Sequence, residues 1–191
     1  DERNKTLSNI ILKLNDIEFD KDIDMLGNAY EYLLKQFASS AGKKGGEFYT
    51  PSEVSTLVAK LASYGHKKAL NVYDPTCGSG SLLLKAYNEM KGNISYIYGQ
   101  ELNNTTYNLA RMNMFLHGVH YHSFKIRQGN TLNNDKFSNE KFNIIVANPP
   151  FGTKWDATPD KLTDDRFEKY GKLAPASKGE FAFIQHMVHH L

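Results

Sequence analysis

The chain has 191 residues, of which 23 are basic and 21 acidic, so its formal net charge is only +2. Hydrophobic residues make up 40% and charged residues 23%, which is typical of a globular domain and excludes a disordered tail, a collagen and a coiled-coil rod. The near-zero charge argues against a strongly basic nucleic-acid binder that acts alone. The single cysteine, Cys77, excludes a disulfide framework and suits a reducing cytosol.

The first forty residues are predicted to be helical. Apolar side chains between Met25 and Phe37 recur at helical spacing and form one face. The glycine-rich segment 41–48 predicts a loop after this helix. No apolar run reaches the roughly 20 residues that a membrane span needs.

A second helix is expected to begin at Pro51. A proline at the first helical position costs no hydrogen bond, because the N–H it lacks has no partner there. Thr50 is the expected N-cap, and Glu53 would complete a capping box.

Beyond Gly65 short apolar strands alternate with helices. Strands are expected at 70–74, 94–101, 124–129 and 142–148, and helices at 81–90, 105–118 and 181–191. This alternation predicts an α/β fold with a parallel sheet and right-handed crossovers. The long polar stretch 151–179 is expected to be a functional or mobile loop.

The first candidate site lies where the first strand runs into the segment Asp-Pro-Thr-Cys-Gly-Ser-Gly-Ser (74–81). Gly78 and Gly80 permit a tight bend close to a ligand, and the helix that follows offers free N–H groups to an anion. Glu101, at the end of the second strand, can accept hydrogen bonds from both ribose hydroxyls of a nucleoside cofactor. The third glycine of the dinucleotide fingerprint is missing, so this loop alone fits either a cofactor site or an ordinary tight turn.

The second candidate site follows the fourth strand and reads Asn148-Pro149-Pro150-Phe151. Two prolines stiffen the turn and remove two N–H donors, which leaves carbonyl oxygens without local donors. The Asn148 side-chain oxygen and the Pro149 carbonyl can accept both hydrogens of a planar amino group, and Phe151 can stack on a flat ring. These bonds would stabilise the positive charge that develops on the nitrogen as it attacks. The alternative is a rigid turn with no chemical role.

In combination these segments resemble the S-adenosylmethionine-dependent amino-methyltransferases, and specifically the modification (methyltransferase) subunit of type I restriction–modification systems. The matching motifs occur in the family's order and read GEFYTPSEV (46–54), DPTCGSGSLLL (74–84), GQELN (99–103) and NPPF (148–151). The resemblance implies a Rossmann-like sheet with helices on both faces, preceded by a helical region. The family's sheet has more strands than the four predicted here. We therefore expect a helical N-terminal segment over 1–46 and the N-terminal part of a truncated catalytic domain over 47–191.

The resemblance also implies roles for individual residues. It assigns methyl transfer to Asn148, Pro149, Pro150 and Phe151. It assigns cofactor contacts to Glu47, Phe48, Tyr49, Thr50, Pro51, Ser52, Asp74, Gly78, Ser79, Gly80, Ser81, Glu101 and Asn130. Among these, Asp74 would order the ammonium group of the cofactor's methionine part. Asn130 replaces an aspartate that in the family reads the cofactor's adenine, and it can accept the same hydrogen bond without a charge.

The implied activity is adenine-specific DNA methylation, with S-adenosyl-L-methionine as methyl donor and a target base flipped out of the duplex. The implied partners are double-stranded DNA, a DNA-specificity subunit and, in some assemblies, a restriction (nuclease) subunit. No membrane is implied, and the expected location is cytoplasmic. Two alternatives stay open: an amino-methyltransferase acting on ribosomal RNA guanine or on a protein glutamine amide, and, more remotely, a nicotinamide-dependent dehydrogenase.

No metal site is expected. His186 and His190 are four residues apart on a predicted helix, but no third ligand or acidic partner accompanies them in the sequence. Cys77 is expected to be a buried cysteine and not a nucleophile. Phe181 and Phe183 either pack in the core or border the pocket of the target base.

Overall fold

The computed structural model describes residues 8, 23–40 and 49–191. Its helices are α2 (Ile23–Ser40), α3 (Ser52–Ser63), α4 (Ser81–Glu89), α5 (Asn104–Leu116) and α6 (Gly179–His190), with short 3-10 helices η2 (Pro159–Thr163) and η3 (Glu168–Tyr170). Its strands are β1 (Ala69–Asp74), β2 (Ile94–Glu101), β3 (Phe124–Gln128) and β4 (Ile144–Ile145). Within the described part, none of the helices has the length and apolar character that crossing a membrane requires.

The four strands form one parallel sheet in the order β3-β2-β1-β4. Val72 of β1 lies between Ile97 of β2 and Ile144 of β4, which fixes the register across the centre of the sheet. The strand order reverses between β1 and β4. In an open parallel sheet such a reversal opens a crevice at the carboxyl ends of the strands, where ligands bind.

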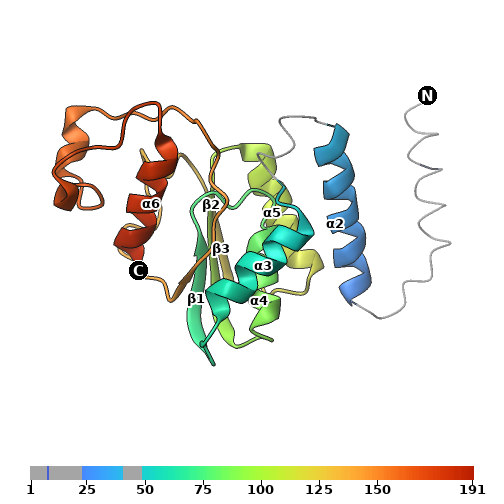
Figure 1. The fold of residues 1–191 in the computed structure, drawn as a ribbon. Coiled ribbons are helices and arrows are strands. Elements are labelled where there is room, and N and C mark those ends of the chain that lie inside the picture. The colour runs from blue at the N-terminus through green and yellow to red at the C-terminus, as the bar shows by residue number, and fades with distance from the viewer. Residues whose placement is uncertain (1–7, 9–22, 41–48) are drawn as a thin grey trace.

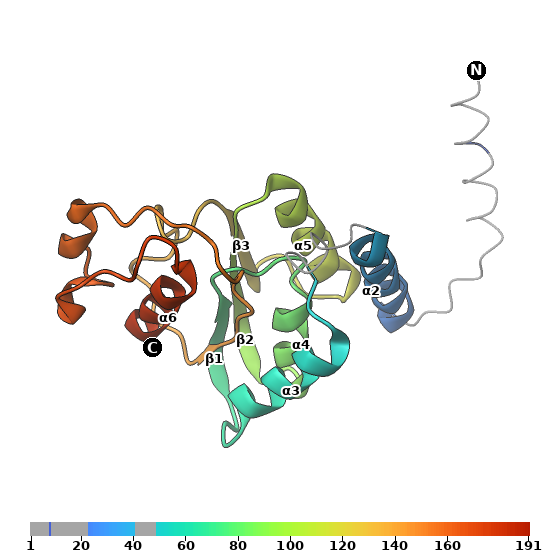
Figure 2. The ribbon, with the colours of Figure 1, turned by 45° about the horizontal axis from the view of Figure 1, so that its top comes forward.

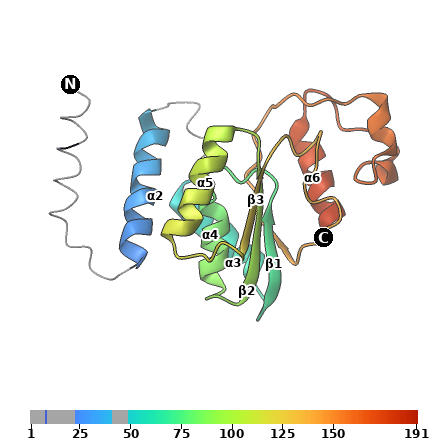
Figure 3. The same cartoon turned by 180° about the vertical axis from the view of Figure 1, so that it is seen from behind.

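Helices cover both faces of the sheet, as predicted. Figures 1 and 3 show α3, α4 and α5 on one face and α6 on the other. Figure 2 shows α2 further out, beyond α5 on the same side as α3 and α4. The described part is therefore an α/β fold with a helical layer added outside the sheet and its covering helices.

Neighbouring residues of β1 point to opposite faces and anchor separate cores. Val72 is fully buried among apolar side chains of α4 and α5 such as Leu83 and Met114. Tyr73 points to the other face, where its ring stacks on Phe142 with centroids 4.2 Å apart. Burial on both faces explains why two large apolar residues, Val72 and Tyr73, follow one another in β1.

The segment 151–179 is a long loop, as predicted, with only the short helices η2 and η3 within it, and it packs against the rest of the fold. Trp155 and Phe167 are buried together with Phe183 of α6 in a separate apolar cluster. Arg166, only 6% exposed, donates hydrogen bonds to the carbonyls of Thr131 and Leu132, to the Asp164 carboxylate and to His186. The apolar residues are scattered among charged ones without a helical or strand period, so the sequence pattern did not indicate this packing.

The predicted capping box of α3 is wrong. The residue before the helix is Pro51, with ψ of 140°, and no side chain caps the first turn. The Thr50 hydroxyl instead accepts a hydrogen bond from Asn148 Nδ2 at 3.3 Å. Glu53 lies in the first turn, where its charge favours the helix dipole without a capping bond.

Candidate functional site at the carboxyl ends of the strands

Two adjacent cavities open at this edge of the sheet. The larger has a volume of about 730 Å³, within the range of sites for nucleoside-sized molecules. It is lined by Pro75, Thr76, Glu101, Leu102, Asn103, Asn104, Thr106, Gly129, Asn130, Thr131, Leu132, Asn148, Pro150, Thr153, Lys154, Trp155 and Phe183. The smaller, of about 20 Å³, is lined by Tyr49, Thr50, Asp74, Thr76, Cys77, Gly78, Ser79, Ser81, Leu82 and Asn148. Thr76 and Asn148 line both cavities, so the two are neighbours.

The glycine bend between β1 and α4 forms the floor of the smaller cavity. Gly78 and Gly80 have φ angles of 54° and 79°, in the left-handed region that favours glycine. A Cβ on Gly80 would also lie 2.7 Å from Met114 Cε of α5. The turn therefore favours glycine at position 80, directly before the first N–H groups of α4, and a side chain there would also displace the end of Met114.

Glu101 ties the end of β2 to the glycine bend. Its Oε2 accepts a hydrogen bond from the Gly78 N–H at 3.0 Å, and its Oε1 accepts one from the Asn103 N–H at 2.8 Å. Burial raises the pKa of Glu101. Each carboxylate oxygen keeps a further lone pair, so the side chain can still accept hydrogen bonds from a molecule in the larger cavity.

Asp74 is a buried acid at the smaller cavity. It is 2% exposed, and its Oδ1 accepts hydrogen bonds from the Thr76 N–H at 2.8 Å and the Thr76 hydroxyl at 3.3 Å. Burial, with a smaller contribution from the nearby Glu101, raises the pKa of Asp74 to about 7, although the hydrogen bonds from Thr76 oppose this shift. A cationic ligand beside this carboxyl would stabilise the ionised form and lower the pKa again.

The Asn148 turn faces the same cavities from the end of β4. Since the Asn148 amide nitrogen donates to Thr50, the side-chain oxygen is the end of the amide left for a ligand. Pro150 lines the larger cavity. Phe151 is 84% exposed, and its predicted stacking on a target base stays a prediction.

The structure gathers most of the predicted site residues. Tyr49, Thr50, Asp74, Gly78, Ser79, Ser81 and Asn148 line the smaller cavity, and Glu101, Asn130, Asn148 and Pro150 line the larger. Pro51, Ser52, Gly80, Pro149 and Phe151 line neither, and Glu47 and Phe48 lie outside the described residues. Sequence reasoning missed several lining residues, among them Lys154 and Trp155. The only sequence signal for these lining residues was that the single tryptophan lies shortly after the Asn148-Pro149-Pro150-Phe151 turn.

Asn130 has a structural task that the sequence did not indicate. Its side-chain oxygen accepts hydrogen bonds from the N–H groups of Leu132 and Asn133, at 3.1 and 3.2 Å, and closes the turn after β3. The adjacent Thr131 hydroxyl donates to the Pro75 carbonyl at 2.6 Å. The oxygen expected to read a cofactor is thus already engaged in positioning the wall of the larger cavity.

Cys77 is buried as expected. Burial raises the pKa of its thiol well above the ordinary value, so the reactive thiolate is disfavoured. Phe183 packs in the apolar cluster and also lines the larger cavity, so core packing and a place at the cavity wall are both observed for this residue. Phe181 is half exposed.

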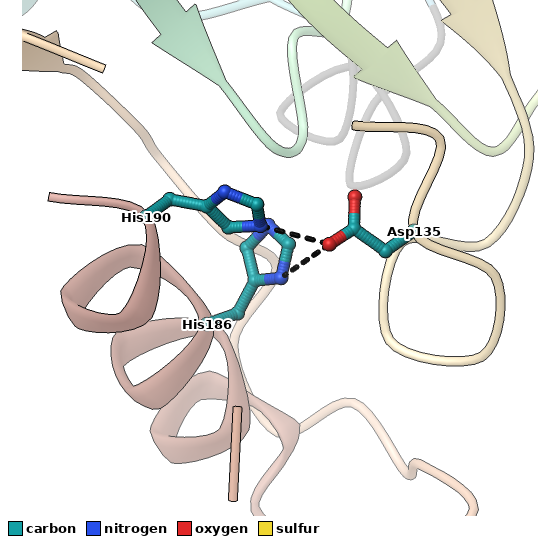
Figure 4. Close-up of side chains that lie close together, drawn as sticks. All are labelled: Asp135, His186 and His190. Carbon is teal, nitrogen blue, oxygen red and sulfur yellow. Dashed lines mark hydrogen bonds and ion pairs between the residues drawn. The ribbon is translucent and has the colours of Figure 1, made fainter. Parts of the chain in front are cut away.

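An acidic residue does accompany the two histidines of α6, contrary to expectation. Figure 4 shows the Asp135 carboxylate facing both rings, with its Oδ2 at 2.8 Å from His190 Nε2 and 3.9 Å from His186 Nδ1. The nitrogens that a metal would need are engaged. Both ring nitrogens of His190 face oxygen acceptors, the second being the Glu140 carbonyl at 2.8 Å, and His186 Nδ1 accepts from the Arg166 guanidinium at 3.2 Å.

The charge of Arg166 also opposes a metal cation at this position. Burial lowers the pKa of His186 to about 3, so its ring is neutral and can accept from the guanidinium. We interpret the group as a hydrogen-bond network that holds α6 to the chain between β3 and β4. The absence of a metal stays a prediction.

Comparison with known proteins identifies the family. The N-6 DNA Methylase family matches residues 21–191. The chain belongs to this family. Relatives include the type I restriction enzyme MpnII methylase subunit of Mycoplasma pneumoniae, 40% identical over 98% of this chain and 38% of the relative. Another is the HindI methylase subunit of Haemophilus influenzae, 38% identical over 88% of this chain and 38% of the relative.

Solved structures agree with this family membership. A type I restriction-modification methyltransferase subunit from Streptococcus thermophilus superimposes with a TM-score of 0.90 and 42% identity, over 98% of this chain and 41% of that chain. A class I S-adenosylmethionine-dependent methyltransferase from Listeria monocytogenes shares the fold, with a TM-score of 0.64 at 17% identity, over 88% of this chain and 52% of that one. The predicted methyltransferase fold and the predicted family are confirmed. The chain spans about 38% of the length of the curated relatives it matches.

Proposed function

We propose that the polypeptide to which this N-6 DNA methylase chain belongs transfers a methyl group from S-adenosyl-L-methionine to the exocyclic amino group of adenine in double-stranded DNA. It would do so in the cytoplasm as the modification subunit of a type I restriction–modification system, together with a DNA-specificity subunit and, in some assemblies, a restriction subunit. The single observation that carries the proposal is that Asn148 lines one cavity with Asp74 and Gly78 and a second with Glu101.

The residues present fit this cofactor. Asp74 is a buried acid whose ionised form needs a cation, which the methionine ammonium group would supply. Glu101 keeps free lone pairs toward a cavity of nucleoside size, as ribose hydroxyls require. When bound, the cofactor supplies a methyl group already activated by its attachment to a sulfonium.

The task left to the protein is alignment and charge stabilisation. The Asn148 side-chain oxygen and the Pro149 carbonyl oxygen accept hydrogen bonds from the two N–H groups of the target amine. These oxygens also stabilise the positive charge that develops on the amine nitrogen. Holding amine and methyl group in line can lower the barrier by roughly 7–11 kcal/mol. An adenine inside a duplex cannot reach this turn, so we expect it to be flipped into the larger cavity.

The test is transfer of a radiolabelled methyl group by the full-length polypeptide with its specificity subunit. DNA, ribosomal RNA and a protein glutamine substrate are offered in parallel, and labelling of DNA adenine alone is expected. Asn148→Ala is expected to lower the rate by at least about 100-fold while cofactor binding persists. The matched control is Asn88→Ala, which removes an exposed asparagine of α4. Normal turnover by Asn148→Ala, or labelling of RNA or protein in place of DNA, would contradict the proposal.

A further inference from the structure

Helix α2 lies outside the sheet and its covering helices, yet it places one carboxylate behind the glycine bend. Glu31 Oε1 accepts hydrogen bonds from the Ser81 hydroxyl at 2.7 Å and from Asn113 Nδ2 at 2.6 Å. Both donors are buried, Asn113 completely. A carboxylate that accepts two short hydrogen bonds from buried donors on α4 and α5 makes a specific tertiary contact and is not a solvated surface charge.

The direction of each hydrogen bond follows from the chemistry of the carboxylate. An ionised carboxylate only accepts, so the Ser81 hydroxyl donates to Glu31. The Ser81 oxygen is then left to accept from the Ser79 hydroxyl, 2.9 Å away. Glu31 therefore stands at the end of a chain of hydrogen bonds that sets the rotamers of both serines in the glycine bend.

Asn113 adds a second connection to the same bend. Its amide nitrogen donates one hydrogen to Glu31 and the other to the Ser79 carbonyl at 3.0 Å. Its side-chain oxygen is buried and has no hydrogen-bond partner among the described residues. The amide thus keeps an orientation that leaves its own oxygen unsatisfied, because Glu31 and the Ser79 carbonyl both require its donors.

The position of α2 is set by packing on α5. The Tyr30 hydroxyl donates to the Leu109 carbonyl at 3.2 Å. A Cβ on Gly27 would lie 2.7 Å from the ring of His117, so the helices approach closely there. Docking of α2 on α5 and the conformation of the glycine bend are consequently joined through Glu31.

We infer that Glu31 is a positioning residue, which holds Ser79 and Ser81 in the conformation that receives the methionine part of the cofactor. This inference rests on the proposed function, because both serines line the smaller cavity that we assign to that part. Thermodynamic linkage makes the effect reciprocal: if docked α2 strengthens cofactor binding, bound cofactor strengthens the docking of α2 by the same factor.

The experiment measures S-adenosylmethionine binding to the full-length polypeptide by titration calorimetry. Glu31→Ala is expected to raise Kd by about 10- to 100-fold, the loss typical of hydrogen bonds to a charged group. Glu31→Gln is expected to bind nearly as the wild type, because both contacts use one oxygen, which an amide oxygen can replace. The kcat at saturating cofactor is expected to change little, so the loss appears in the KM for the cofactor. Gln36→Ala changes an exposed side chain of the same helix and serves as the matched control with unchanged Kd.

Hydrogen exchange of the α2 amides distinguishes a positioning role of Glu31 from a purely structural one, because only the positioning role makes this exchange depend on bound cofactor. Bound cofactor is expected to increase protection of the α2 amides in the wild type and not in Glu31→Ala. If the alanine variant fails to fold, Glu31→Met keeps the side-chain length and the helix preference while removing the acceptor. Wild-type Kd in Glu31→Ala, or equal loss in Glu31→Ala and Glu31→Gln, would overturn the inference. A wild-type protein that does not bind S-adenosylmethionine would instead refute the proposed function.

Discussion

The buried Asp74 carboxyl, which we propose to hold the ammonium group of the cofactor, is expected to destabilise the cofactor-free protein when it is ionised. Burial raises its pKa to about 7 from an ordinary 3.8. Because the folded-state pKa is the higher one, Asp74 supports the folded state only while protonated. Its contribution is complete below about pH 4 and is lost as the pH rises through about 7. The difference between 3.8 and about 7 corresponds to about 4 kcal/mol.

Asp74→Asn removes this titration and keeps an oxygen that can accept both hydrogen bonds from Thr76. Without cofactor, we expect the variant to be more stable than the wild type at pH 8, by up to about 4 kcal/mol. The difference in free energy of unfolding between variant and wild type is expected to grow by about 2–3 kcal/mol between pH 5 and pH 7. Urea unfolding of the full-length polypeptide at several pH values measures this difference, in which groups common to both proteins cancel.

The same change is expected to weaken cofactor binding, because the amide offers no negative charge to the ammonium group. Asp156→Asn, at an exposed carboxylate, is the control for the removal of one negative charge. If the stability difference for Asp74→Asn does not grow between pH 5 and pH 7, the carboxyl ionises normally in the folded protein and the reasoning fails.

Two further predictions concern packing around the site. Arg166→Met leaves the Asp164 carboxylate and two backbone carbonyls without their buried donor, so it is expected to lower the free energy of unfolding by about 3 kcal/mol. The control Lys172→Met, at an exposed position, is expected to change the free energy of unfolding little. If both variants have the same thermal denaturation midpoint, the buried network of Arg166 does not contribute to stability. Gly80→Ala and Gly92→Ala both place a side chain at positive φ, but only the first has a close neighbour, the terminal methyl of Met114. Because that methyl must move within the core, Gly80→Ala is expected to cost about 1 kcal/mol more than Gly92→Ala in urea unfolding, and equal costs would mean that Met114 moves without penalty.

The sheet could be predicted because each strand shows a local apolar pattern. The predicted fourth strand was longer than the observed one, because side-chain hydrogen bonds replace part of its backbone pairing. β4 was expected over 142–148 but pairs with β1 only at Ile144 and Ile145. Before this pair, the Asn143 side-chain oxygen accepts from the Leu70 N–H at 2.8 Å, and the Asn143 N–H donates to Asn71 Oδ1 at 2.8 Å. Two asparagine side chains thus satisfy backbone groups that the apolar pattern assigned to a strand.

The site could be predicted only where its residues belong to a local motif. Asp74 and Asn148 follow buried strands, so their place at one edge of a parallel sheet follows from the topology. Glu31, Asp135 and Arg166 are charged residues most of whose partners lie far away in the sequence. Their neighbours carry no spacing that distinguishes them from solvated charges, so only the folded chain reveals that each closes a buried network.

The Thr50–Asn148 contact changes how the predicted cofactor motif relates to the chemistry. The sequence placed Thr50 in a cofactor-binding segment and Asn148 in a catalytic turn, 98 positions apart. In the structure the Thr50 hydroxyl accepts from the Asn148 amide nitrogen, which leaves the amide oxygen toward the cavities. The proposed reaction needs that oxygen as the acceptor for the target amine. We therefore expect Thr50 to help orient the proposed catalytic asparagine as well as to line the proposed cofactor cavity, so a change that shifts Thr50 should affect turnover and not only cofactor affinity.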